Sequence, residues 1–431
     1  MSNNQSEGDE SRENDPLRDK LETILELARS KRCGTVESTL LDNLRDATSS
    51  ISARAKVEVH QLAVPLTPLL QADSRFPGHN VRLLRAEAGG VGFYPNFVGV
   101  PLVTKLLECG SASEAIAWLG KVLSTTFAFG HSITAVWGAP VAERVRITPD
   151  VELVPIAEIP DSPQKRWLAT VSAHGFNTPM YSAPNLSPPE SALITRRKIE
   201  HVIFSPDTPI DTGGYLETHE LFKEITLALT AIGPRAPLTA VHWFTFEDPD
   251  LQLANILAHS YNQSAIEILP MFLTASYPLD PIEGAEIVGA YLVLKGRTRD
   301  VLRVSLQRLN QSQRRHDVGD RAVELCTGLE ALLGDSQKTE MTHKIKSRAA
   351  RLIGGTIVDR RRNASLVGAA YDIRSSLVHT GKVNTKAAIK IASDKLTPAE
   401  VIEQTQSLSA ELVKIIIRRG ALPEWPEFDV T

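Results

Sequence analysis

Hydrophobic positions recur at two different spacings along the chain. Near the start, Leu17, Leu21, Ile24, Leu25 and Ala28 follow the three- and four-residue steps of an amphipathic helix. Between about residues 81 and 285, short β-branched or aromatic segments are bounded by Pro, Asp, Ser or Gly and are typical of strands: VELVPIAEI, RWLATVSA, KIEHVIFS and LTAVHWFTF. Helical patterns lie between them, in ASEAIAWLGKVLSTTF and ETHELFKEITLALTAI. This alternation predicts an α/β or α+β domain.

From Glu286 onward the pattern is almost wholly helical. Four or five amphipathic helices joined by short loops are expected, and such an arrangement predicts a helical bundle. The Asp residues of DVGD suit a helix N-cap, and Gly334 and Gly381 suit helix C-termini. The helical segments are RDVLRVSLQRLNQ, DVGDRAVELCTGLEALLG, EMTHKIKSRAARLIGG, RRRNASLVGAAYDIRSSLVHTG and TPAEVIEQTQSLSAELVKIIIRRG.

The expected fold class is an α+β multidomain protein, with a mixed α/β N-terminal and middle region followed by an all-α bundle. A chain of 431 residues is long enough for two or three cores. The predicted division is a disordered acidic tail over 1–16, a helical lead-in over 17–80, an α/β domain over 81–285, the bundle over 286–420 and a C-terminal tail over 421–431. The lead-in is expected to contain a second helix near Thr39–Ile51.

Composition favours a globular protein of a reducing compartment. The apolar share is 42% and the charged share 23%, and the apolar stretches are too short or too broken by Pro to span a bilayer. The polar, acidic first residues do not form a signal peptide, so a cytoplasmic location without membrane contact is expected. The scattered Cys33, Cys109 and Cys326 exclude a zinc ribbon or a disulfide framework.

Charge is divided unevenly between the predicted bundle and the rest of the chain. Residues 297–419 contain 23 Lys and Arg against 13 Asp and Glu, an excess of ten positive charges, although the whole chain has a net charge of −4. The remainder is therefore strongly acidic. A basic module on an acidic body indicates a polyanion such as RNA or DNA. The alternative is a solvated surface against which counter-charges fold.

The segment YDIRSSLVHTGK carries the main candidate chemistry. An apolar stripe from Leu366 to Leu377 predicts a helix with one face in a core, and Gly381 places His379 in its last turn. Exposed carbonyl groups at a helix C-terminus favour a protonated imidazole. Arg374 and His379, five residues apart, point about 140° away from each other on a helix. Two copies related by a two-fold axis would bring them together; otherwise they are ordinary surface and capping residues.

This Arg-x4-His element, with the preceding helices DRAVELCTGLEALLG and KIKSRAARL in that order, resembles the HEPN superfamily. The closest likeness is to the ApeA-like HEPN domain, and it covers about Arg297 to Arg419, less than a third of the chain.

The resemblance implies a homodimeric, metal-independent endoribonuclease, often a toxin or an anti-phage defence effector. Arg374 and His379 match the motif and would be catalytic, while Ser375, Glu330 and Tyr371 would support them. The RNA 2′-OH would be the nucleophile, without cofactor or metal. The preceding domain would regulate the nuclease through a trigger ligand or a regulatory protein. Ser375 stands where the family often has Asn, Asp or His, which leaves open a catalytically silent module for RNA binding or dimerisation.

Basic residues of the bundle are candidates for contacts with the RNA backbone. They are Lys344, Arg348, Arg351, Arg360, Arg361 and Arg362. A metal site at His242, Glu247, Asp248 and Asp250 is not favoured, since no second ligand cluster accompanies the strand and turn that carry them. The Gly pairs in EAGGVGFY and DTGGYL do not match a nucleotide-binding motif.

Overall fold

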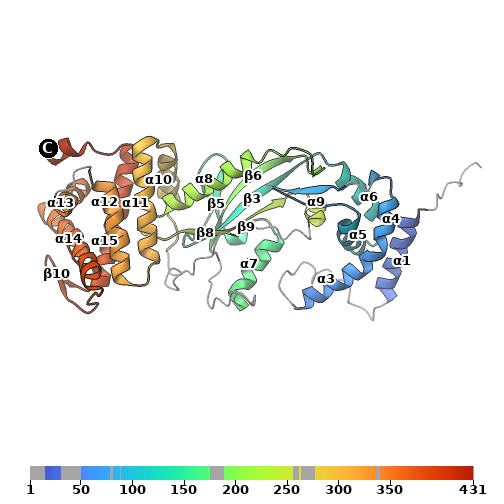
Figure 1. Cartoon of the computed structure of the whole chain (residues 1–431), viewed down its shortest axis with the longest axis horizontal. Coiled ribbons are helices and arrows are strands. Elements are labelled where there is room, and N and C mark those ends of the chain that lie inside the picture. Colours follow the sequence, from blue (N-terminus) through green and yellow to red (C-terminus); the bar gives the residue numbers. More distant parts are fainter. Residues whose placement is uncertain are drawn as a thin grey trace, which may run out of the picture.

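The structure is a computed structural model of the chain. It describes residues 15–30, 50–77, 81–87, 89–174, 189–255, 262–263, 277–335 and 340–430. Nearly all of the predicted N-terminal tail and most of the predicted helix near Thr39–Ile51 lie outside these ranges. The molecule is elongated, with N-terminal helices at one end, a β-sheet in the middle and a helical bundle at the other end (Figure 1).

The N-terminal helices pack around a core that also contains side chains of the central sheet, such as Ala128 and Phe244. The amphipathic helix predicted near the start of the chain is confirmed as α1. Its Leu17, Leu21, Ile24 and Leu25 are buried in that core. The helix over Pro95–Cys109 was not predicted, because its internal Pro101 reads as a breaker in the sequence. The elements are α1 (Pro16–Ser30), α3 (Ser50–Ala63), η1 (Val64–Leu66), α4 (Thr67–Ala72), α5 (Pro95–Cys109) and α6 (Ala112–Ser124), with a small sheet of β1 (Leu83–Ala86), β2 (Gly89–Gly92) and β7 (Ile203–Phe204).

The central sheet has six antiparallel strands in the order β4-β5-β6-β3-β8-β9. Its strands are β3 (Phe127–Trp137), β4 (Val145–Arg146), β5 (Val151–Pro155), β6 (Ser191–Glu200), β8 (Leu238–Phe246) and β9 (Asn262–Gln263). The predicted strands in VELVPIAEI, KIEHVIFS and LTAVHWFTF are confirmed. The strand predicted for RWLATVSA is wrong, because that segment lies in α7 (Pro163–His174). A hydroxyl of Ser162 accepts a hydrogen bond from the Lys165 amide at the start of α7, and Pro163 follows it, as at many helix N-termini.

Each face of the sheet is covered differently. Ile133, Trp243 and their neighbours pack with Leu168 of α7 on one face. On the other face, Val136 and Leu193 belong to a core that also contains residues of α8 (Gly213–Leu229). A 3-10 turn, η3 (Ile156–Glu158), and the short α9 (Pro249–Ala254) complete the described elements of this region.

The C-terminal region is helical, as predicted. Its helices are α10 (Pro281–Val293), α11 (Gly296–Arg314), α12 (Val318–Leu333), α13 (Met341–Ile353), α14 (Ile357–Thr380), α15 (Pro398–Arg419) and α16 (Trp425–Val430). The predicted caps are confirmed: Asp317 accepts hydrogen bonds from the amides of Gly319 and Asp320, and Gly381 ends α14 at φ 68°. A hairpin of β10 (Ile389–Ile391) and β11 (Asp394–Leu396) interrupts the helical pattern. The expected C-terminal tail contains α16.

The sheet and the bundle share one continuous core. That core includes Leu193 of β6, Phe222 of α8 and Leu306 of α11. Polar contacts add to it: Glu224 of α8 accepts a hydrogen bond from the Tyr291 hydroxyl at 2.8 Å and lies 3.1 Å from Arg303. The two regions therefore support each other, and the border predicted at residue 286 falls inside α10.

Candidate functional site

The last turns of α14 carry the Arg-x4-His element. Ala370, Tyr371 and Ile373 are buried against the bundle core and fix the rotation of the helix. With that face inward, the Arg374 side chain lies at the border of the core and is 37% exposed. The apolar stripe seen in the sequence therefore positions the arginine.

Among the described residues, Arg374 has one acidic neighbour, Glu330 on α12. The nearest oxygen of Glu330 is 4.0 Å from Nη2 of Arg374, which is too long for a hydrogen bond. The Nε atom of Arg374 is buried and has no hydrogen-bond partner in the described part of the chain. A half-buried guanidinium whose N–H groups are not satisfied is suited to bind an anion.

Two ionisable side chains beside Arg374 and Glu330, those of Cys326 and Tyr371, are uncharged at neutral pH. Burial raises the pKa of the Cys326 thiol to about 12. Burial also raises the pKa of the Tyr371 phenol, and the neighbouring Cys326 and Glu330 raise it further. Both groups therefore keep their protons at neutral pH, which excludes Cys326 as a thiolate nucleophile.

His379 lies where the sequence predicts it, in the last turn of α14 and exposed to solvent. Ser375, one turn earlier on the same face, is also exposed. No hydrogen bond or ion pair joins His379 to Arg374, although both residues are described. A single chain thus places the predicted catalytic pair on one helix without bringing the two side chains together.

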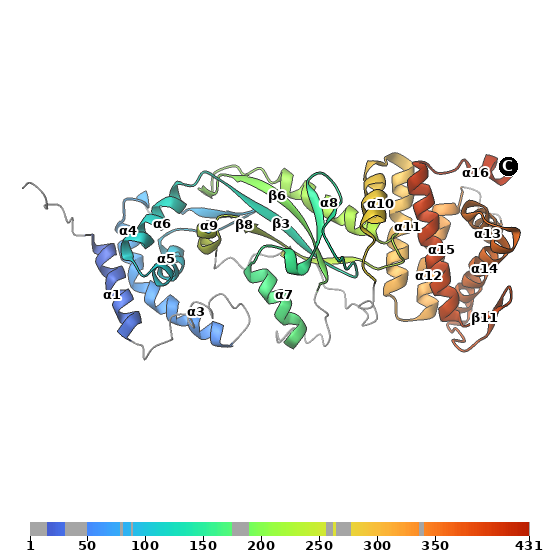
Figure 2. The ribbon, with the colours of Figure 1, turned by 180° about the vertical axis from the view of Figure 1, so that it is seen from behind.

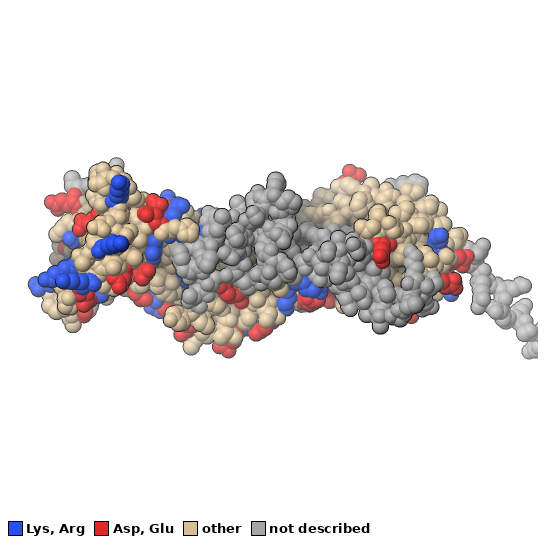
Figure 3. Space-filling view, turned by 90° about the horizontal axis from the view of Figure 1, so that it is seen from below, with Lys and Arg blue, Asp and Glu red and all other residues tan. Residues whose placement is uncertain are grey.

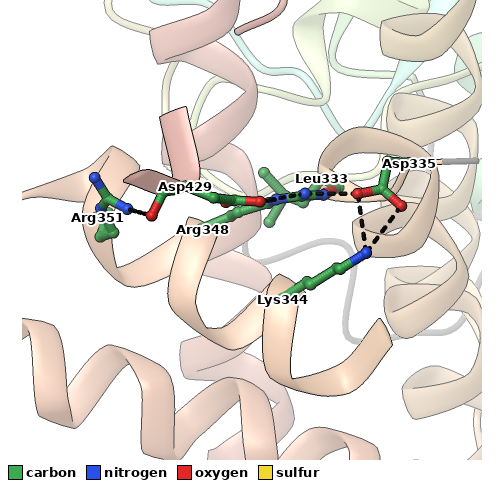
Figure 4. A network of polar contacts seen from close by, with 6 residues as sticks. All are labelled: Leu333, Asp335, Lys344, Arg348, Arg351 and Asp429. Carbon is green, nitrogen blue, oxygen red and sulfur yellow. Dashed lines mark hydrogen bonds and ion pairs between the residues drawn. The ribbon is translucent and has the colours of Figure 1, made fainter. Parts of the chain in front are cut away.

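Arg348, a predicted contact of the RNA backbone, is 1% exposed, and its guanidinium is engaged within the bundle (Figure 4). Its Nε and Nη2 atoms donate to Asp429 at 2.9 and 2.6 Å. Nη2 also donates to Asp335 at 2.7 Å, and Nη1 donates to the carbonyl of Leu333 at 2.7 Å. The guanidinium stacks 4.9 Å from the ring centroid of Trp425. Arg348 ties the end of α12 and α16 to α13.

The other predicted RNA-binding residues are divided between engaged and open side chains. Lys344 lies 3.3 Å from Asp335, and Arg351 donates to the carbonyl of Asp429 at 2.8 Å. Arg362 donates to Gln404 at 2.6 Å. Arg360 and Arg361 at the start of α14 are exposed. Arg360 donates through Nε to the carbonyl of Gly355 at 3.2 Å, and its exposed Nη groups and Arg361 are the parts of the set best placed to meet a polyanion.

Counter-charges fold against much of the bundle's positive excess. Glu324 accepts from Arg308 and Arg315 at 2.8 and 2.7 Å, and Lys414 lies 2.7 Å from Glu283. The view in Figure 3 shows basic and acidic side chains interleaved over the bundle end rather than a uniform basic face. The alternative explanation of the charge excess therefore accounts for a large part of it.

Sequence reasoning missed a buried polar cluster between the small sheet and β8. His242 contacts Glu87 through Nε2 and Thr134 through Nδ1, both at 2.7 Å, and Ser132 donates to the second oxygen of Glu87. Glu87 has a left-handed φ of 55°, which is strained for a non-glycine residue. The cluster was not predictable because Glu87 lies in a turn far from His242 in sequence.

The acidic residues near His242 in sequence have other partners. Glu247 forms an ion pair with Arg196, and Lys121 forms ion pairs with Asp248 and Asp250. Within the described ranges, no three His, Cys, Asp or Glu side chains are grouped so that they could hold a metal ion.

Comparison of the chain with protein-family models, with curated proteins and with solved structures gives no match. Among the helices that the structure describes, none has the length and apolar character required to cross a membrane. The proposals below therefore depend on the geometry of the chain and on the sequence resemblance.

Proposed function

We propose that the protein is a metal-independent endoribonuclease of HEPN type. The observation that supports this most directly is Arg374, a half-exposed guanidinium that has no hydrogen bond within the described chain and whose nearest acid is 4.0 Å away. Phosphate oxygens are acceptors that match the fork of a guanidinium. His379 adds an exposed imidazole at the end of the same helix.

The proposed reaction uses the substrate's own nucleophile. The 2′-OH of the RNA loses its proton to an imidazole of His379, and its oxygen attacks the adjacent phosphorus. The P–O5′ bond breaks, and a protonated imidazole gives a proton to the departing 5′-oxygen. Arg374 stabilises the negative charge that develops on the phosphate oxygens. The products are a 2′,3′-cyclic phosphate and a 5′-hydroxyl end.

A homodimer through the C-terminal bundle is part of this proposal. One α14 directs Arg374 and His379 about 140° apart, so a second copy must complete a shared groove. Val378, next to His379 on α14, is 60% exposed, so an apolar side chain is available where a second copy would have to approach. Two subunits would also supply one histidine as base and the other as acid.

We propose that the chain acts in the cytoplasm as a toxin or an anti-phage defence effector that the sheet region regulates. The shared core of sheet and bundle offers a physical route, since a trigger ligand or regulatory protein at the sheet would act on α10 and α11 through α8. Toxicity on overexpression that disappears with His379→Ala would support this role, and toxicity unchanged by that substitution would contradict it.

The test of cleavage is incubation of RNA with the full chain in the presence of a chelator. We expect cyclic-phosphate ends from the wild type, and no cleavage above background from His379→Ala or Arg374→Met. His343→Ala is the matched control, because His343 is an exposed helical histidine of the same bundle. Undiminished cleavage by His379→Ala would overturn the mechanism.

The second candidate is a catalytically silent module for RNA binding or dimerisation. Ser375 favours it, since it is exposed one turn before His379 and has no side-chain charge or ring to assist proton transfer. RNA binding that survives both Arg374→Met and His379→Ala, together with the absence of cleavage in every state of the protein, would establish this reading.

A further inference from the structure

Two phenylalanine side chains lie exposed on one face of the central sheet. Phe127 and Phe129 at the start of β3 are 52% and 37% exposed, and their ring centroids are 6.3 Å apart. Ala128, between them, points to the opposite face and is buried in the core of the N-terminal helices. Packing against that core therefore does not account for the two rings.

Two cations from the neighbouring strand lie over these rings. The guanidinium carbon of Arg196 is 4.1 Å from the centroid of Phe129, and Nζ of Lys198 is 5.0 Å from that of Phe127. Phe129 is paired directly with Lys198 in the ladder of β3 and β6, so the contacts join adjacent strands on one face. Aromatic and cationic groups thus alternate over a small area.

Glu247 holds the Arg196 guanidinium in a fixed plane. Its two carboxylate oxygens accept from Nε and Nη2 at 2.7 and 2.9 Å, which is a bidentate geometry. The fork leaves the Nη1 donors of Arg196 without a partner among the described residues, and the side chain remains 58% exposed. Lys198 forms one ion pair, with Glu200 at 2.9 Å, and is 47% exposed. The parts of the two rings that these cations leave exposed, the guanidinium of Arg196 and the spare N–H donors are therefore presented to solvent together.

We propose that this face, defined by Phe127, Phe129, Arg196 and Lys198, binds single-stranded nucleic acid. Unpaired bases stack on aromatic rings and on guanidinium planes, and phosphate oxygens accept from the spare donors of Arg and Lys. Protein interfaces are also enriched in Phe and Arg, but their centres are depleted of Lys and Glu, whereas Lys198, Glu200 and Glu247 all lie at this face. A protein partner therefore fits less well. A duplex hides its base faces and is also disfavoured.

The surface lies apart from the Arg-x4-His element. Figure 2 places β3 in the middle of the molecule and α14 at the bundle end. The face would thus hold a strand rather than cut it. This inference does not rest on the proposed cleavage, and it would hold for the silent module as well.

The experiment measures binding of labelled single-stranded RNA and DNA homopolymers by fluorescence anisotropy. The full chain carries His379→Ala throughout, so that cleavage does not enter the result. We expect Phe127→Ala and Phe129→Ala each to weaken binding roughly tenfold. Phe97→Ala is the matched control, because Phe97 is 44% exposed on α5 and no Arg or Lys of the described ranges lies over its ring. Equal affinity in all variants, or no binding by the parent chain, would overturn the proposal.

Two further variants separate stacking from a general loss of structure. Phe129→Trp keeps an aromatic surface and should retain affinity, whereas Phe129→Leu keeps apolar volume and should lose it. Equal affinities of these two variants would contradict stacking. Inorganic polyphosphate serves as a competitor that lacks bases: we expect it to compete poorly, and competition as effective as that of RNA would reduce the surface to a charge site and overturn the proposal.

Discussion

Helices α13 and α14 each carry a central arginine of the bundle, and the two side chains have opposite environments. Arg348 on α13 is 1% exposed and donates to two carboxylates and a backbone carbonyl. Arg374 on α14 is 37% exposed, and its nearest acid is 4.0 Å away. The same residue type is therefore a structural tie in one helix and an unsatisfied cation in the other.

The difference arises from what each helix faces. Arg348 meets the end of α12 and the C-terminal helix α16, which together bring Asp335, Asp429 and the Leu333 carbonyl within hydrogen-bond distance (Figure 4). Arg374 meets the last two turns of α12 at Cys326 and Glu330, and Glu330 is the one acid near it in the described chain. An anion-binding site is thus best sought at a basic side chain that has no acidic partner within hydrogen-bond distance, as at Arg374. The number of basic residues in a helix does not show where such a side chain lies.

Among substitutions at the two arginines and their partners, the largest effect is expected on the rate of RNA cleavage when Arg374 is replaced. Arg374→Lys keeps the charge but removes the fork that fits a phosphate, so RNA cleavage should fall by roughly 10²–10³-fold, on the scale of removing one transition-state donor. The measurement is the initial rate with chelator present. Stability should change little, because Arg374 makes no hydrogen bond within the described chain. Full activity of the Lys variant would show that Arg374 does not grip a phosphate.

The next effect is on folding. Arg348→Met leaves Asp335 and Asp429 without their buried cation, so the free energy of unfolding should fall by about 3–5 kcal/mol. Urea unfolding followed by circular dichroism measures it. Arg374→Met is the matched comparison and should differ from wild type by about 0.5 kcal/mol or less. Similar decreases in both variants would abolish the distinction between the two arginines.

A smaller effect is expected from the carboxylate partner, and it depends on pH. Asp429→Asn removes the charge that faces Arg348 and should cost about 1–2 kcal/mol at neutral pH. The hydrogen bond from Arg348 lowers the pKa of Asp429 below its ordinary value. The stabilisation that ionised Asp429 contributes is therefore complete above the pKa of this carboxyl in the unfolded chain, about 4. It is lost as the pH falls through the lower pKa of Asp429 in the folded protein.

Unfolding curves of wild type and Asp429→Asn at several pH values test this directly. The gap between the two proteins should stay constant from neutral pH to about pH 5 and close below about pH 4. A gap that widens on acidification would mean that Asp429 contributes in its protonated form.

The smallest effect concerns the salt dependence of RNA binding. Arg360→Gln with Arg361→Gln should reduce the slope of log affinity against log salt by roughly 0.7 for each phosphate that the protein no longer neutralises. Lys344→Gln should change the slope less, since Lys344 already faces Asp335. A larger change for Lys344 would indicate that its ion pair with Asp335 opens when RNA binds.

Sequence patterns predicted those parts of the fold that local signals determine. The helical C-terminal region, its caps at Asp317 and Gly381, and β8 follow from periodicity and from capping residues. The composition of RWLATVSA favours a strand, but Ser162 and Pro163 begin a helix immediately before it. The hairpin at 389–396 and the docking of α16 depend on long-range contacts that no local pattern reveals.

For the candidate site too, the sequence predicted features set by local spacing and missed those set by long-range contacts. The position of His379 at the end of its helix and the inward stripe beside Arg374 follow from spacing. Burial of Arg348 does not, because Asp429 is 81 residues away in sequence. The exposure of Phe127 and Phe129 could not be predicted from the sequence either, since an apolar residue in a strand is ordinarily expected to face a core.

The core common to the sheet and the bundle has a practical consequence. Excising the bundle at its predicted border would cut α10 and strip α8 away from Tyr291 and Arg303, leaving Glu224 without its partners. The sheet region left behind and the excised bundle would each expose apolar side chains of the shared core and tend to aggregate. Heat or denaturant should accordingly melt the two regions in a single cooperative step, so that a ligand gripping the strands would protect the distant helices from proteases.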